Sequence, residues 1–344
     1  MQAIRLTARG REGVRLVEMA RPEAGPGEVR LRMLAASVNR VDLYMRDDGT
    51  GITHELPLTM GVDGVGEVLE GGEAAGLAPG RRVILYPAVV CGRCRACRAG
   101  DQPLCDRVRF FGEHIDGTFA TEKVVPAASV LPLPEALGVT QGAALGVAYL
   151  TAWRMVLGKA PAGPGQTVLV QGAGGGVSHA AVQIARMAGA RVIATTTGAG
   201  KIAHLRALGV EVIDYAAEDV ARAVRARTDG AGADLVIDNS GARSWPASLR
   251  SAAKGGHVVT CGATTGGDPS AEIQRLFVRQ LSVHGSTLGS LEEFRRLLAA
   301  AATGALAPQI DSVFPLAEVP AAFDRLEHPD RLGKVIVRID DAAA

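Results

Sequence analysis

The chain has 344 residues, with 37 basic and 36 acidic side chains and a formal net charge of +1. This length suits two domains, and the near-neutral balance predicts partnership with neither nucleic acid nor an anionic membrane. The opening sequence MQAIRLTARGREGVRLVE lacks the apolar segment of a signal peptide. No uncharged apolar run approaches the roughly 18 residues of a membrane span, so we expect no spanning helix.

The first third of the chain has short β-type runs separated by turns rich in glycine and proline. This alternation predicts an antiparallel, barrel-like unit. The runs are 15–18, 28–38, 65–70 and 81–87.

Four of the five cysteines follow in one window, Cys91, Cys94, Cys97 and Cys105, spaced C-x2-C-x2-C-x7-C. Four thiolates from one loop suit a closed, tetrahedral zinc site that shapes the loop and leaves no position for water. We expect a cytoplasmic protein, because a reducing compartment keeps these thiols available for metal. The alternative is a pair of disulfides in an exported protein, but such scaffolds are usually short and carry an export signal. The chemistry must therefore lie elsewhere in the chain.

From Thr167 onward, apolar strand runs alternate with segments of helical period. This pattern predicts a parallel sheet covered by helices on both faces. The predicted strands are 167–171, 191–196, 210–215, 235–240, 257–262 and 281–286. After Ser290 we expect a helix over 291–304, a strand over 309–315, a helix over 316–326 and a strand over 333–339.

A glycine-rich turn, Gly172 to Ser178, joins the first of these strands to a helix. Missing side chains at Gly175 and Gly176, with the amide of Val177, would let a pyrophosphate approach the helix N-terminus. A plain tight turn is the alternative. The second strand ends without the acidic residue that usually holds the ribose of NADH. Thr197, Gly198 and Lys201 stand there instead, so we favour NADPH.

Together these features resemble the medium-chain dehydrogenase/reductase superfamily, which includes zinc alcohol dehydrogenases and zinc-free quinone oxidoreductases. The resemblance spans the chain and rests on GPGEVRLRMLAASVNRVDLYMR, GVDGVGEV, APGRRV, the cysteine loop, DGTFATEKVVP, LTAWRMV, the glycine turn and the terminal GKVIV. It implies an α/β protein: a GroES-like antiparallel β catalytic domain over 1–148 and 289–344, a doubly wound Rossmann NADP-binding domain over 149–288, and an active site in the cleft between them.

The sequence departs from the zinc alcohol dehydrogenases at every catalytic zinc ligand. The corresponding positions are Asn39, Val62 and Val147, and the relay hydroxyl becomes Val41. Valine offers no lone pair and an amide is a poor zinc ligand. We therefore expect one structural zinc per chain, in the cysteine loop, and no catalytic zinc. A further departure is Ser178, where the turn usually has glycine, which could weaken the packing of helix against strand.

The resemblance also assigns candidate site residues. It would place three residues along the nicotinamide: Asn39, Tyr44 and Thr151. Asn39 could hydrogen-bond the substrate oxygen or the cofactor ribose. Tyr44 could donate a proton or only form a wall of the pocket. His114 could donate a proton near neutral pH, or be a loop histidine bonded to Asp116 or Glu113; His54 is a weaker candidate at the rim. The remaining cofactor candidates are Tyr215, Asn239, Cys261 and Lys334, although Cys261 could simply be a small buried hydrophobe.

Hydride transfer without a Lewis acid suits quinones and alkenes conjugated to a carbonyl, since their oxygen spreads the developing charge. The leading hypothesis is thus an NADPH-dependent quinone or activated-alkene reductase. Alternatives are an alcohol or sugar dehydrogenase, without zinc or with atypically bound metal, and a cofactor-binding protein without redox turnover. We also expect a homodimer, because the strand at 281–286 lacks the prolines and lysines that usually protect an exposed edge.

Overall fold

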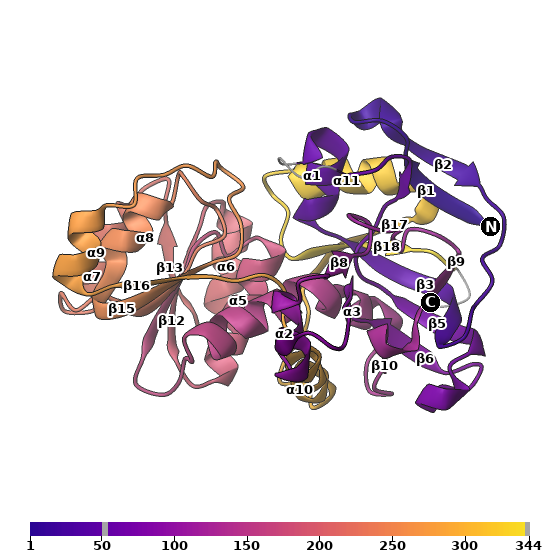
Figure 1. The fold of residues 1–344 in the computed structure, drawn as a ribbon. Coiled ribbons are helices and arrows are strands. Elements are labelled where there is room, and N and C mark those ends of the chain that lie inside the picture. Colours follow the sequence, from indigo (N-terminus) through magenta and orange to yellow (C-terminus); the bar gives the residue numbers. More distant parts are fainter. Residues whose placement is uncertain (50–53, 341–344) are drawn as a thin grey trace. The chain divides into compact units, whose positions relative to one another are not determined.

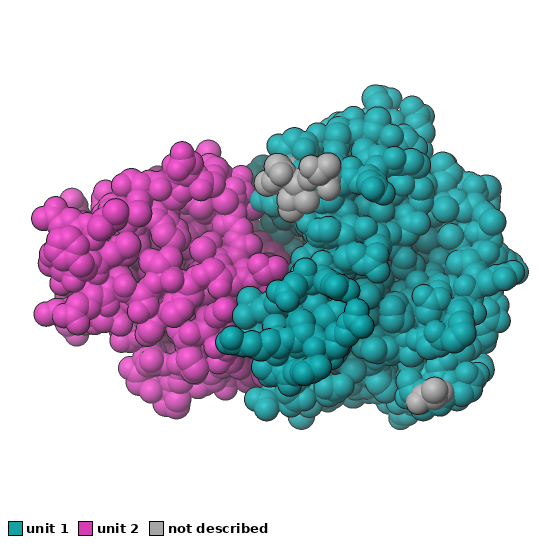
Figure 2. All heavy atoms as spheres, viewed as in Figure 1, with its two compact units in different colours: residues 1–148, 290–344 teal, residues 149–289 magenta. Residues whose placement is uncertain are grey.

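The computed structural model describes residues 1–49 and 54–340. The chain forms two compact units (Figure 2). Unit 1 comprises Met1–Ala148 and Ser290–Ala344, and unit 2 comprises Tyr149–Gly289. Unit 1 is therefore assembled from both ends of the sequence, with unit 2 inserted between them.

Unit 1 is built on largely antiparallel sheets (Figure 1). Among the described residues, a three-stranded sheet has the order β2-β1-β4, and a seven-stranded sheet follows β10-β6-β5-β3-β18-β17 with β9 also paired to β3. β7 and β8 form a small hairpin-like pair, and β17 and β18 run parallel. The strands are β1 (Gln2–Leu6), β2 (Val14–Glu18), β3 (Glu28–Val38), β4 (Leu58–Thr59), β5 (Val65–Gly71), β6 (Arg82–Leu85), β7 (Ala88–Val89), β8 (Arg109–Phe110), β9 (Glu122–Pro126), β10 (Val130–Pro132), β17 (Ile310–Pro315) and β18 (Lys334–Arg338).

The long strand β3 organises this unit. One edge pairs with β5, while the other pairs first with β9, through Glu28–Arg32, and then with β18, through Ala35–Val38. Two register shifts in the β3–β5 ladder bend the strand, as β-bulges do. The last strand of the chain thus completes a sheet begun near its start.

Helices of unit 1 cover this sheet and close its core. Val319, Ala322, Phe323 and Leu326 form one face of α11, spaced as a buried helical stripe requires, and lie in a cluster with the apolar side chains of β18. α10 begins with a capping box in which Ser290 and Glu293 bond each other's backbone N–H. The helices are α1 (Arg40–Asp47), α2 (Arg95–Arg98), α3 (Val139–Ala144), α10 (Leu291–Ala302) and α11 (Val319–Glu327).

Unit 2 is a doubly wound parallel sheet with the strand order β13-β12-β11-β14-β15-β16. The order reverses between β11 and β14, where ligands of such sheets usually bind. Figure 1 shows α5 and α6 on one face and α7, α8 and α9 on the other. The strands are β11 (Thr167–Val170), β12 (Arg191–Thr196), β13 (Glu211–Asp214), β14 (Ala233–Ile237), β15 (Ala252–Thr260) and β16 (Ser282–Gly285). The helices are α4 (Leu150–Trp153), α5 (Gly176–Met187), α6 (Ala199–Ala207), α7 (Val220–Arg227), α8 (Trp245–Ser251) and α9 (Ile273–Arg279).

The structure confirms the predicted fold class, an antiparallel β unit and a parallel α/β unit. It also adds elements that the sequence patterns did not predict, among them β1 and α1. β1 holds its place by pairing with two other strands, β2 and β4, rather than by a strong local signal. No helix in the described part of the chain is long and apolar enough to cross a membrane.

Candidate functional site

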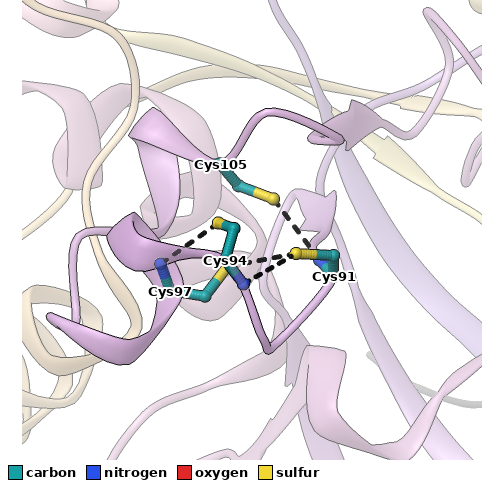
Figure 3. Close-up of side chains that lie close together, drawn as sticks. All are labelled: Cys91, Cys94, Cys97 and Cys105. Atoms are coloured by element: carbon teal, nitrogen blue, oxygen red, sulfur yellow. Dashed lines mark hydrogen bonds between the residues drawn. The ribbon is translucent and has the colours of Figure 1, made fainter.

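The four clustered cysteines converge in unit 1 (Figure 3). Their Sγ atoms all lie within 4.8 Å of one another, and those of Cys91 and Cys97 are 3.9 Å apart. Tetrahedral zinc with Zn–S bonds near 2.3 Å separates its sulfurs by about 3.8 Å. All five cysteines of the chain are free thiols. The geometry therefore fits a single zinc ion held by the loop.

Backbone amides in the loop are directed at the sulfurs. The N–H of Cys94 donates to Cys91 Sγ at 3.3 Å, and the N–H of Arg107 donates to Cys105 Sγ at 3.4 Å. Such bonds, from Arg93 first and then from Cys94, lower the pKa of the Cys91 thiol to about 6. Burial and the neighbouring thiols raise the pKa of Cys97 to about 12. A divalent cation would keep all four sulfurs deprotonated, so the donor set favours a bound metal.

The positions where zinc alcohol dehydrogenases hold their catalytic metal contain a buried hydrogen-bond network in this chain. Asp63 is its centre. One carboxylate oxygen accepts from Ser37, at 3.1 Å from N–H and 2.8 Å from Oγ. The other accepts from Asn39 Nδ2 at 3.2 Å and from the N–H of Val147 at 3.0 Å. The carboxylate is therefore held by protein donors on both oxygens.

Asn39 links this carboxylate to a buried lysine. Lys334 Nζ donates to Asn39 Oδ1 at 2.6 Å and to the carbonyl of Val38 at 2.9 Å. The carboxylate of Asp42 accepts from the backbone N–H of Asn39 at 2.8 Å and caps α1. Burial lowers the pKa of Lys334 to about 8 and raises that of Asp42 to about 7. The amide of Asn39 thus has protein partners at both its oxygen and its nitrogen, and the residue is only 6% exposed.

His114 and Tyr44, the other catalytic candidates of unit 1, lie nearer the surface. His114 is exposed, and its Nδ1 accepts from the N–H of Phe110 at 3.3 Å. Its predicted partner Asp116 instead bonds Arg5 and the N–H of Thr59. The ring of His114 lies 5.7 Å from that of His54. Tyr44 is half-buried on α1. The sequence did not indicate that His54 joins Glu113 and His114 in one cluster, because His54 lies 59 positions before Glu113.

In unit 2 the glycine turn has the geometry that a phosphate site needs. Gly172 has φ of 64°, a conformation that favours glycine. α5 then begins at Gly176, and its first helical hydrogen bond runs from the N–H of His179 to the carbonyl of Gly175 at 2.7 Å. The amides of the first turn, including that of Val177, therefore lack partners within the helix and are available to an anion.

Ser178 strengthens this junction rather than weakening it. The side chain is fully buried, and Oγ donates to the carbonyl of Gln171 at 2.7 Å. Oγ also lies 3.1 Å from Asn239 Oδ1, an atom of the strand-end loop after β14. The hydroxyl therefore ties the first turn of α5 to the ends of two neighbouring strands, which glycine could not do.

The end of β12 presents the residues proposed to recognise a 2′-phosphate. Thr195 is already engaged, since its Oγ1 donates to Gln171 Oε1 at 2.8 Å. Thr197 and Lys201 are half-buried, and Gly198 is exposed with φ of 92°. Lys201 Cε lies 3.4 Å from the place of a Cβ on Gly198, so the lysine side chain folds back over the turn. Tyr215, half-exposed at the end of β13, bonds Thr196 through its N–H at 3.3 Å.

Two further unit 2 candidates have little room for chemistry of their own. Thr151 is buried on α4. Burial raises the pKa of the Cys261 thiol to about 12, and the nearby charge of Asp238 contributes. A thiol with such a pKa stays protonated and is a poor nucleophile, so Cys261 suits the role of a small packing residue.

Comparisons with known proteins find dehydrogenases and reductases along the whole chain. The family of zinc-binding dehydrogenases matches residues 176–303, and that of alcohol dehydrogenase GroES-like domains matches residues 25–135. A crystal structure of an NAD-dependent alcohol dehydrogenase is 38% identical, covers 99% of this chain and 100% of its own, and superposes with a TM-score of 0.93.

Two similar proteins have names that refer to coenzyme A compounds. Acryloyl-coenzyme A reductase of Metallosphaera sedula is 28% identical over 95% of this chain and 97% of its own. The structure of a 2-octenoyl-CoA carboxylase reductase with NADP and 2-octenoyl-CoA is 27% identical, covers 98% of this chain and 87% of its own, and gives a TM-score of 0.88. Other relatives bear the name alcohol dehydrogenase.

Proposed function

We propose, from the premise that this chain belongs to the zinc-type medium-chain dehydrogenase/reductase superfamily, that it is a reductase of activated alkenes or quinones that works without a catalytic metal. The observation that carries this proposal is the network around Asp63. Asn39, Val62 and Val147 supply no zinc ligand set, and the ammonium of Lys334 is bonded to Asn39 itself. A second cation at that place would meet a buried positive charge.

An acceptor with its own electron sink removes the need for a Lewis acid. In a conjugated alkene, hydride adds to the β-carbon, the electron pair moves to the carbonyl oxygen, and a proton completes the α-carbon. NADPH, when bound, supplies the hydride. The protein then has to hold the acceptor, shield it from water and provide the proton. The alkene-reductase names of two relatives support this acceptor class.

His114 is our candidate proton donor. Because its Nδ1 accepts from the N–H of Phe110, the neutral ring carries its proton on Nε2. The exposed side chain can present that proton outward. Asn39 is a weaker donor candidate, since both ends of its amide are engaged inside the protein. We assign it, with Lys334, to positioning of the site. Tyr44 remains a candidate donor or wall.

For the cofactor we propose NADPH. The turn over Gly175, Gly176 and Val177 would hold the pyrophosphate, and Thr197, Gly198 and Lys201 would meet the 2′-phosphate, with Tyr215 at the adjacent strand end. The cationic lysine suits a dianionic phosphate, and no carboxylate follows β12 to repel it. Thr151, Asn239 and Cys261 complete the proposed nicotinamide contacts of unit 2. We keep 149–288 as the proposed Rossmann NADP-binding domain and 1–148 with 289–344 as the proposed catalytic domain.

We also propose a cytoplasmic homodimer joined through unit 2. β16 is an edge strand, paired only with β15 in the described sheet. Next to it in sequence, α9 exposes large apolar side chains, with Ile273 70% and Phe277 66% exposed, and β16 exposes Val283. A second copy would cover these side chains and satisfy the free backbone groups of the edge.

A steady-state comparison of acceptors tests the proposal. Chelator-treated enzyme would be assayed with an α,β-unsaturated thioester, a benzoquinone, and a secondary alcohol in the oxidative direction, each with both nicotinamide cofactors. We expect reduction of the alkene or quinone with NADPH and little alcohol oxidation. The alcohol dehydrogenase names of several relatives favour the second candidate function, and dominant, chelator-sensitive alcohol oxidation would establish it instead. NADPH binding without turnover on any acceptor would indicate a cofactor-binding protein.

A further inference from the structure

Unit 1 contains a second cluster of metal-ligating side chains, formed by His54, Glu113 and His114. One donor atom from each residue lies within 4.8 Å of the other two. Two other histidine pairs touch, His179 with His204 at 3.1 Å and His257 with His284 at 2.9 Å. Neither pair belongs to a group of three donors among the described residues. The His54 cluster is therefore distinct from an ordinary histidine contact.

His54 has a buried nitrogen with no hydrogen-bond partner in the described part of the chain. Its side chain is 1% exposed, and Nε2 lies 3.7 Å from Glu113 Oε1, beyond hydrogen-bonding distance. A buried polar nitrogen without a partner is destabilising, because it has lost its hydrogen bonds to water. The nitrogen without a partner faces the mostly buried carboxylate of Glu113. A cation bound between the two atoms would give both of them a partner.

The segment that carries the other two donors is held rigidly. Gly112 donates its N–H to the carbonyl of Ile115 at 2.8 Å and has φ of 68°. A Cβ there would lie 2.4 Å from the carbonyl oxygen of Gly61, so only glycine fits. The N–H of His114 donates back to Phe110 at 2.9 Å. These contacts fix the backbone of Glu113 and His114 relative to the loop at Gly61, between β4 and β5.

We propose that His54, Glu113 and His114 bind a divalent transition-metal ion of the zinc class. Two imidazoles and one carboxylate are a ligand set that zinc accepts, with bonds of about 2.0–2.2 Å and donors about 3.4 Å apart in a tetrahedron. The distance of 3.7 Å between His54 and Glu113 is close to that value. The exposed side chain of His114 can close the remaining gap, and its solvent side leaves the fourth position for water.

The guanidinium of Arg9 contacts His54 and should weaken the binding of a cation to the cluster. Its Nη2 lies 3.3 Å from His54 Nδ1 and must be the donor, so the proton of the neutral ring sits on Nε2. A metal on Nε2 requires that proton on Nδ1, and Arg9 must then release the ring. The charged groups at the site are Glu113 and Arg9, and a second positive charge weakens binding of a cation. We therefore expect a weaker, exchangeable site beside the tightly held loop zinc.

The same nitrogen of His114 cannot hold a metal and donate a proton at once. The metal-bound and proton-donating forms are alternative states, but the binding proposal does not depend on the proposed function. Its test therefore uses no activity measurement. The expectation of one zinc per chain rested on the cysteine loop and on the missing ligands at Asn39, Val62 and Val147. The cluster of His54, Glu113 and His114 lies outside both sets and would raise the capacity to two metal ions.

Cobalt(II) provides the probe. Purified protein with its loop zinc retained would be titrated with Co²⁺ and followed by visible absorption and by metal analysis. We expect one additional equivalent, with ligand-field bands but no thiolate-to-cobalt charge transfer, because the cluster has no sulfur. His114→Ala and Glu113→Gln should each weaken this binding about 100-fold or more, while His328→Ala, an exposed histidine elsewhere in unit 1, should leave it unchanged.

Arg9→Met sharpens the test, since it should tighten Co²⁺ binding about tenfold by removing the competing charge and donor. No binding beyond the loop would overturn the proposal, as would equal binding by the His114→Ala and His328→Ala proteins. Thiolate charge transfer in the titration would assign the ion to the cysteines and would also overturn it. Unchanged Co²⁺ affinity in the Arg9→Met protein would place the ion away from His54 Nε2 and would overturn the proposed three-residue site.

Discussion

Replacing Asn39 by alanine should destabilise unit 1 severely. Its side-chain oxygen accepts from the Lys334 ammonium at 2.6 Å, and its nitrogen donates to the Asp63 carboxylate at 3.2 Å. Each is a buried hydrogen bond to a charged group, worth about 1.5–3 kcal/mol. The two together set an expected loss of about 3–6 kcal/mol in the free energy of unfolding. The Asp42 cap of α1 is made to the backbone N–H and should survive.

Hydrogen exchange read by mass spectrometry can measure this loss in unit 1 directly. Amides of β3 and β18 flank Asn39 and Lys334, so their exchange through local opening should accelerate by about 100-fold or more. Both tryptophans, Trp153 and Trp245, lie in unit 2 and supply an internal control. Their fluorescence transition in denaturant should move little in the Asn39→Ala protein.

Arg40→Ala, at an exposed neighbouring position on α1, is the matched control and should behave as the parent. The reasoning fails if the free energy of unfolding of the Asn39→Ala protein stays within about 0.5 kcal/mol of the parent, the usual effect of a surface change. It would then follow that Lys334 and Asp63 find other partners. Asn39 would regain its place as a candidate donor to the substrate.

Four further outcomes are expected. Lys201→Ala should weaken NADPH binding about 10–100-fold by removing a charge-assisted contact to phosphate, with NADH almost unaffected; calorimetric titration of both cofactors decides, and equal losses would refute the assignment. Cys94→Ser should remove the loop zinc and lower the melting temperature of unit 1 without changing cofactor affinity, as metal analysis and calorimetry can show. Burial lowers the pKa of His179 to about 4, so the unfolded chain binds more protons than the folded chain between pH 4 and 6.5. The free energy of unfolding should therefore fall as the pH is lowered through that window. This pKa shift changes the free energy of unfolding by at most about 3 kcal/mol. Denaturant unfolding at several pH values should show a weaker dependence of stability on pH in a His179→Gln protein than in a His328→Gln control. Phe277, 66% exposed, lies on the proposed dimer interface, so Phe277→Asp should give a monomer in sedimentation where the parent sediments as a dimer. A parent that sediments as a monomer at micromolar concentration would contradict the proposed interface.

Features encoded within a short stretch were predictable from the sequence. The cysteine loop brings its four donors together over 91–105, so its spacing alone indicated a metal site, and the structure confirms the convergence. The glycine turn was equally local, because strand, turn and helix follow one another directly. The absence of zinc ligands at Asn39, Val62 and Val147 was visible once these positions were aligned with the resembling family.

Tertiary structure decided what fills the places left by those ligands. Lys334 meets Asn39 across 295 positions of sequence because β18 pairs with β3, and neither strand's pattern of apolar residues specifies that pairing. His54 likewise meets Glu113 through tertiary packing, because the two residues lie in segments that are distant in the chain. Hydrophobic period and turn chemistry act over a few residues and determine which elements form. Which charged groups become buried neighbours depends on how those elements pack, and that depends on the whole unit.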